Sequence, residues 1–147
     1  PLFLGCADYR STIASNGESS GFTFPEEMRR HADKGTALVT DKDPGDAEIA
    51  EVVSQAAAHS CIVLGTYNGH ILQGQLRLAK ALAATGLPMI LVALRNPYDL
   101  RNMPNHVAAL AGWEYTRPLF DALWPVLNGT ARPTGKLPLL TLTKAAK

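Results

Sequence analysis

Polar and aromatic side chains gather in four short segments of this 147-residue chain, each directly after an apolar run. Arginine and aromatic residues are enriched at the centres of binding surfaces, so these segments predict contact with a ligand or a partner. The candidate binding residues are Arg10, Tyr67, Asn68, Arg95, Asn96, Tyr98, Trp113 and Glu114.

Two carboxylates in these segments, Asp99 and Glu114, could share general acid–base chemistry. Structural roles compete with this interpretation and are favoured over it. Asp99 can cap the short turn at 100–102, and Glu114 can pair with Arg10, Arg95 or Arg117. No G-x-S-x-G motif is present, so no nucleophile is predicted.

Metal and nucleotide sites also lack a pattern in the sequence. The four histidines are widely spaced, without a partner four residues on and without nearby clusters of carboxylates. His70 is the one that lies in a predicted loop beside polar neighbours, and we expect it to be solvated. The glycines between Gly65 and Gly74 do not follow the spacing of a phosphate-binding loop, and no Walker A lysine occurs. We therefore predict no metal and no cofactor.

The composition excludes other classes of function. Fourteen Lys and Arg against thirteen Asp and Glu give a net charge of +1, which argues against nucleic acids and anionic membranes as partners. The longest apolar run, 87–94, is far shorter than the roughly 20 residues of a transmembrane helix. Cys6 and Cys61 lie inside apolar runs, so we expect both to be buried and reduced.

Short apolar runs alternate with amphipathic stretches along the chain. The runs do not alternate apolar with polar residues, which is typical of parallel strands buried on both faces. Strands are predicted at 1–7, 36–40, 61–65, 89–94 and 107–111, and helices at 25–34, 46–59, 75–85 and 116–127. The predicted fold is a three-layer αβα sandwich around a mostly parallel, about five-stranded sheet, flavodoxin-like in outline. Parallel strands end at one edge of a sheet, so all four polar segments should meet there.

Several of these segments resemble a known family. The stretch Ile90-Leu-Val-Ala-Leu-Arg-Asn-Pro-Tyr-Asp-Leu100 is similar to a strand and loop in the C-terminal domain of glycoside hydrolase family 3 (GH3), in the β-N-acetylglucosaminidase branch. Gly65-Thr-Tyr-Asn68, the Gln75-Leu76 start of the next helix and the closing stretch 128–138 resemble further motifs of that branch. The resemblance covers about 48–140, whereas the first 45 residues match in outline only.

The resemblance implies an accessory domain of an enzyme in carbohydrate metabolism that removes N-acetylhexosamine. In that family a separate (β/α)8 barrel carries the aspartate nucleophile, and in this branch a barrel loop carries a His–Asp acid/base pair. A barrel of about 250 residues does not fit in this chain, so no catalytic residue is carried over. In β-glucosidase-type members this domain lends an acid/base glutamate, but no glutamate here aligns with it.

We therefore expect residues 1–147 to be one α/β domain, the C-terminal part of a longer two-domain chain. The start at Pro1, inside an apolar run, favours the same interpretation. Its expected partners are the barrel and an amino-sugar glycoside. Tyr and Trp can offer faces to a sugar ring, while Asn and Arg can bond hydroxyls, although docking to the barrel is the more expected role. The alternative is a free-standing flavodoxin-like module that binds a small ligand or regulates a partner.

Overall fold

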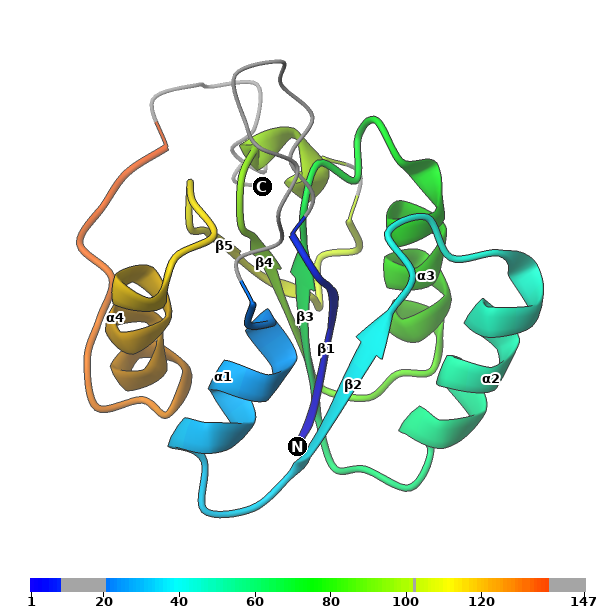
Figure 1. Cartoon of the computed structure of the whole chain (residues 1–147), viewed down its shortest axis with the longest axis horizontal. Helices are drawn as coiled ribbons and strands as arrows, with labels where there is room; N and C mark the ends of the chain where they lie inside the picture. Colours follow the sequence, from blue (N-terminus) through cyan, green and yellow to red (C-terminus); the bar gives the residue numbers. More distant parts are fainter. Residues whose placement is uncertain (9–20, 102, 138–147) are drawn as a thin grey trace.

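Five parallel strands form the centre of the molecule in the computed structural model, which describes residues 1–8, 21–101 and 103–137 (Figure 1). The elements in chain order are β1 (Leu2–Cys6), α1 (Phe24–His31), β2 (Thr36–Thr40), α2 (Asp46–Ala56), β3 (Ile62–Thr66), α3 (Gln73–Ala84), β4 (Met89–Ala93), the 3-10 helix η1 (Pro97–Leu100), β5 (Ala108–Ala111) and α4 (Arg117–Leu127). No helix of the described ranges is long and apolar enough to cross a membrane.

The strands lie in the order β2-β1-β3-β4-β5, and every neighbouring pair is parallel. Helices α1 and α4 cover one face of the sheet and α2 and α3 cover the other (Figure 1). The predicted three-layer sandwich is thus confirmed. The chain reverses its direction across the sheet between β1 and β3, which makes the carboxyl ends of these two strands the topological switch point.

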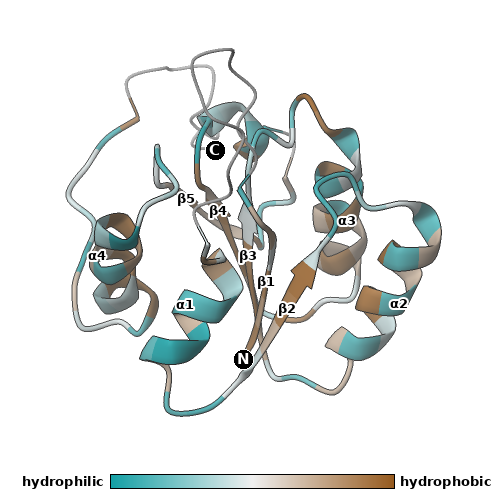
Figure 2. Cartoon of the chain, viewed as in Figure 1, coloured by the Kyte–Doolittle hydropathy of each residue, from teal (hydrophilic) through white to brown (hydrophobic). Residues whose placement is uncertain are grey.

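The central strands β1, β3 and β4 supply both halves of the core, as their apolar sequences require (Figure 2). In β3, Ile62 and Leu64 pack under α2 and α3, whereas Val63 packs under α1 and α4. All five residues of β1 and of β3 are buried. Because both faces are covered, a polar residue on a central strand would lose water on either side.

Two glycines let β1, β3 and α1 approach closely. A Cβ on Gly5 would lie 2.8 Å from the carbonyl oxygen of Gly65, its partner across the β1–β3 ladder. A Cβ on Gly65 would overlap the Phe24 ring and lie 2.8 Å from Leu94 Cδ1. Phe24 fills the space that Gly65 leaves free, and it is fully buried.

Most element boundaries fall close to their predicted positions, and the differences have local causes. Helix α1 starts with the N-cap Thr23, whose hydroxyl accepts from the Glu26 N–H at 3.4 Å. Helix α3 begins two residues earlier than predicted, at Gln73. Its first turn is satisfied from the β2–α2 turn, where Asp43 Oδ1 accepts from the Gly74 N–H at 2.7 Å. A capping group 31 residues away leaves no local pattern in the sequence.

The two cysteines differ, although both are free thiols. Cys6 is 3% exposed, and burial raises the pKa of its thiol from 9.0 to about 12. Cys61 is only half-buried, so the expectation that both are buried is wrong for this residue. It precedes β3 at the amino edge of the sheet, where it lines an apolar hollow.

Candidate functional site

Seven of the eight predicted binding residues follow β3, β4 and β5 at the carboxyl edge of the sheet. Tyr67 and Asn68 follow β3; Arg95, Asn96 and Tyr98 follow β4; Trp113 and Glu114 follow β5. The eighth, Arg10, lies outside the described residues. The edge thus brings together three segments that are far apart in the sequence.

Tyr67 and Asn68 are buried, at 5% and 8% exposure, although they were expected on the surface. The Tyr67 ring packs edge-on against Tyr115, with 5.4 Å between centroids. The backbone of Tyr67 bonds twice with the Gln75 side chain: its N–H donates to Oε1 at 2.8 Å, and its carbonyl accepts from Nε2 at 3.0 Å. The buried amide of Gln75 therefore fixes the loop after β3 to the start of α3.

Two non-glycine residues of the described chain have a left-handed backbone, and both belong to this edge. Asn68 has φ of 55° and Trp113 has φ of 70°. Asparagine tolerates this backbone region, whereas tryptophan rarely adopts it. The Trp113 side chain is also half exposed, at 50%. Residues held in unfavourable backbone conformations concentrate at functional sites, which supports a role for the Trp113 loop.

Asp99 is fully buried and joins the loops after β3 and β4. Its Oδ2 accepts from the Gly69 N–H at 2.9 Å, and its Oδ1 accepts from the His70 N–H at 2.8 Å. His70 Nδ1 lies 3.1 Å from the same Oδ1. A carboxylate can only accept hydrogen bonds, so the imidazole must carry a proton on Nδ1. Charge-assisted bonds of this kind are about twice as strong as neutral ones.

These contacts correct one expectation and bear on two further interpretations of the sequence. Asn96 caps the 3-10 helix η1, since its Oδ1 accepts from the Tyr98 N–H at 3.2 Å, while the turn at 100–102 that Asp99 was expected to cap includes Asn102, which lies outside the described residues. His70 is held by Asp99 and is not a freely solvated side chain. Asp99 has both oxygens engaged away from solvent and is poorly placed to share acid–base chemistry with Glu114.

The exposed members of the edge remain available for contact: Arg95, Tyr98, Trp113 and Glu114, with Asn96 half-buried between them. The Arg95 guanidinium lies over the Tyr67 ring at 5.9 Å, which orients it through a cation–π contact. Arg117, one of the expected partners of Glu114, instead bonds to Glu27 of α1, with Nε 3.1 Å from Oε1.

Of the residues that organise this edge, sequence reasoning missed Asp43 and Tyr115, and it named His70 and Gln75 without these roles. The Tyr115 hydroxyl accepts from the Phe24 N–H at 2.7 Å and donates to the Cys6 carbonyl at 3.0 Å. It thereby ties the end of β1 to the start of α1. The available signal was a polar group within an otherwise apolar face, as for Gln75 in α3.

Within the described residues, no three His, Cys, Asp or Glu side chains come together as a metal ion would require. The buried Thr66 hydroxyl at the end of β3 has no hydrogen-bond partner among these residues. What the edge offers among the described residues is an arginine, an asparagine, two exposed aromatic faces and a glutamate, a set suited to binding.

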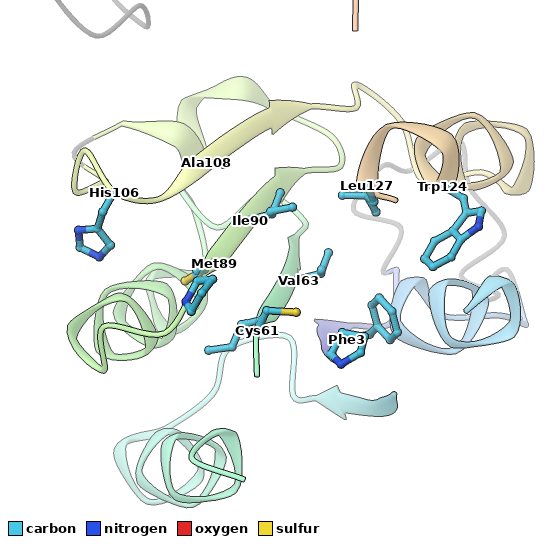
Figure 3. A pocket seen from close by; sticks show the side chains of 12 residues that line it. Phe3, Cys61, Val63, Met89, Ile90, His106, Ala108, Trp124 and Leu127 are labelled. Carbon is cyan, nitrogen blue, oxygen red and sulfur yellow. The ribbon is translucent and has the colours of Figure 1, made fainter. Parts of the chain in front are cut away.

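A hollow of about 400 Å³ lies at the opposite, amino edge of the sheet (Figure 3). Trp124 and Leu127 of α4 and Val63 and Ile90 of the sheet line it, together with Cys61 at its rim. The lining is almost entirely apolar. Besides His106 and the Trp124 indole, its lining side chains offer few hydrogen-bonding groups, in contrast to the carboxyl edge.

Comparison with known proteins shows where this architecture occurs. No protein-family model matches the sequence, and no curated protein does. Among solved structures, a GH3 β-N-acetylglucosaminidase from Paenibacillus sp. str. FPU-7 is similar over 98% of this chain, with a TM-score of 0.80 and 25% identity. A fungal multi-domain GH3 β-N-acetylglucosaminidase, described as having a GCN5-related glucosamine N-acetyltransferase region, is similar over 93%, with a TM-score of 0.72 and 18% identity. This chain spans 28% and 15% of those proteins, so its structural neighbours are domain-sized parts of multidomain GH3 enzymes.

Proposed function

We propose that this chain is the accessory α/β domain of a GH3 β-N-acetylglucosaminidase-like enzyme and that it packs on the catalytic domain through its carboxyl edge. The observation that carries the proposal is the similarity to the Paenibacillus enzyme, which extends over 98% of this chain and 28% of that one. A similarity that covers nearly all of one chain and about a quarter of the other is expected when the first chain corresponds to one domain of the second. The sequence motifs at 90–100 and 128–138 independently resemble the same branch of the family.

The composition of the carboxyl edge supports its role as the contact surface. Tyr98 and Trp113 are 40% and 50% exposed, although large aromatic side chains favour burial. Beside them, Arg95 and Asn96 supply hydrogen bonds that a partner backbone or a sugar hydroxyl can accept or donate. The loop that carries Arg95, Asn96 and Tyr98 is held by the buried bonds of Asp99 to Gly69 and His70, so less ordering entropy is lost on binding.

In this proposal the chain contributes no catalytic group. A retaining glycosidase needs two reacting groups about 5–5.5 Å apart across the scissile bond. At the carboxyl edge, Asp99 is sequestered by its hydrogen bonds and Glu114 is exposed, so no such pair is formed by these two residues. The resemblance assigns the nucleophile and the acid/base to a barrel domain, and this domain would line one wall of the sugar pocket at most.

The test compares the 147-residue chain with the longer protein encoded by its genomic reading frame. We expect the purified chain to leave an aryl N-acetylglucosaminide intact and the longer protein to hydrolyse it. Turnover by the chain alone would overturn the accessory role. A reading frame that encodes no barrel would instead favour a free-standing module.

The contact surface is tested by Arg95→Ala in the longer protein. We expect kcat/KM to fall about tenfold, equivalent to roughly 1.4 kcal/mol, with an unchanged circular dichroism spectrum of the isolated domain. Lys34→Ala is the matched control, because Lys34 is an exposed cation between α1 and β2 at the amino edge. Equal effects of the two substitutions would argue against docking through the carboxyl edge.

A further inference from the structure

A polar hollow of about 560 Å³ lies between α3 and η1, beside the residues described above. The side chains that line it are His70, Gln73, Leu76, Lys80, Tyr98 and Arg101. Gln73, Leu76 and Lys80 are three and four residues apart on α3, so they share one face of that helix. Only Tyr98 also belongs to the predicted binding residues.

The charge of this hollow is one-sided. Lys80 and Arg101 supply two cations, and no carboxylate is among the lining residues. None of the ion pairs within the described residues involves Lys80 or Arg101. The Arg101 guanidinium lies over the Tyr98 ring at 5.2 Å, which restricts its position without neutralising it. In a chain whose net charge is only +1, two cations that form no ion pair within the described residues raise the local positive potential, which attracts an anion.

His70 borders the hollow with a defined tautomer. Its Nδ1 faces the fully buried Asp99 carboxylate at 3.1 Å, and its ring lies 5.9 Å from that of Tyr98. Nε2 is therefore the nitrogen left for a ligand: it accepts a hydrogen bond when the ring is neutral and donates one when it is protonated. Gly69 permits this arrangement, because a Cβ there would lie 3.3 Å from Asp99 Oδ2 and 3.2 Å from Leu76 Cδ2.

We propose that this hollow binds a small organic anion, whose carboxylate or phosphate group lies between Lys80 and Arg101. The planar guanidinium suits either group, since both match its fork of N–H donors. Leu76 and the Tyr98 ring supply an apolar wall for the rest of the ligand, and His70 Nε2 supplies the hydrogen bond that orients it. The site requires no contact with another domain, so it stands independently of the function proposed above.

The experiment is an NMR titration of the 15N-labelled 147-residue chain with inorganic phosphate and, separately, with malonate, at constant ionic strength set by chloride. We expect saturable shifts of the amides of 70–80 and 97–101 with at least one of the two anions. Saturation by phosphate alone identifies a phosphate ligand, and saturation by malonate alone identifies a carboxylate ligand. Shifts that do not saturate with either anion would overturn the proposal.

Variants separate a built site from general attraction to a cationic surface. Lys80→Gln and Arg101→Gln should each weaken binding at least about fivefold, because each removes one charge-assisted partner of the anion. Lys34→Gln and Arg132→Gln are the controls, since both cations are exposed and lie away from the hollow. Equal weakening by controls and test variants would also overturn it. A shift of the His70 Nε2 resonance on binding, lost in Asp99→Asn, would support the role of the fixed tautomer.

Discussion

The two edges of the sheet are built differently, although the same five strands end at both. At the carboxyl edge, buried side chains hold the loops through bonds between residues that are about 30 positions apart, such as Asp99 with Gly69 and His70. At the amino edge the connections leave an apolar hollow, where His106 forms a hydrogen bond to the Ala83 carbonyl at 3.1 Å. Hydrogen bonds of buried side chains hold the loops of the carboxyl edge, whereas the connections at the amino edge pack mainly through apolar side chains.

This difference indicates which interactions stabilise each edge of the fold. Burying a carboxylate is unfavourable unless its hydrogen bonds are complete, so Asp99 makes the carboxyl edge dependent on a few groups. The amino edge depends on contacts between apolar surfaces, and loss of any one polar group there costs little. Substitutions of similar size at the two edges should therefore lower the free energy of unfolding by unequal amounts.

The largest effect is expected for Asp99→Ala. The substitution leaves the N–H groups of Gly69 and His70 without their acceptor and should lower the free energy of unfolding by about 3 kcal/mol. His106→Ala, at the amino edge, should lower it by about 1 kcal/mol or less, because its side chain is largely exposed and forms one bond. Urea unfolding measures both values, and equal losses would contradict the difference between the edges.

Helices and strands could be predicted because their signals are local. β3 and β4 are unbroken apolar runs, and α1 begins with Thr23, Pro25 and two glutamates. The parallel order then placed the loops after β3, β4 and β5 at one edge. The roles of individual loop residues could not be predicted, because they depend on partners distant in sequence. Asp99 next to a turn resembles a cap, and only the folded chain brings it to His70, 29 residues away.

A smaller effect is expected where β3 passes beneath α1. Gly65→Ala places a Cβ against the Phe24 ring, which is fully buried and has no free space to move into. Overpacking of this kind should lower the free energy of unfolding by about 2 kcal/mol. Gly135→Ala is the control, because nothing lies within 4 Å of its added Cβ. If Gly65→Ala unfolds at the same urea concentration as the control, the close approach of β1, β3 and α1 does not contribute to the stability of the fold.

Alkaline pH should weaken the same region through Cys6. Burial raises the pKa of the Cys6 thiol from 9.0 to about 12, so the unfolded chain loses this proton first. The stability from burying a neutral thiol is complete below pH 9 and is lost as the pH rises towards 12. Between pH 8 and 10 the loss should be about 1.4 kcal/mol. Burial also raises the pKa of Tyr115, which adds a further loss at higher pH.

Replacement of the buried thiol tests this pH dependence. Cys6→Ala should flatten the fall in stability between pH 8 and 10. Urea midpoints of the variant and the parent chain, recorded across this pH range, measure the change in slope. An unchanged slope in Cys6→Ala would show that the buried thiol is not the titrating group.

The smallest effect concerns the left-handed backbone at Trp113. With φ of 70°, this position favours glycine over any residue that has a Cβ. We expect Trp113→Gly to be more stable than Trp113→Ala by about 0.5 kcal/mol, since relief of strain exceeds the greater entropy of glycine in the unfolded chain. Tyr98 is the matched control, being 40% exposed in η1 without a left-handed backbone, and there alanine should be the more stable substitution.

Opposite signs of the glycine-minus-alanine difference at the two aromatic positions would show that the chain retains an unfavourable backbone conformation at Trp113 and presents its ring. The same sign at both would mean that the Trp113 loop relaxes in solution and that its exposed ring is not held in place for a partner.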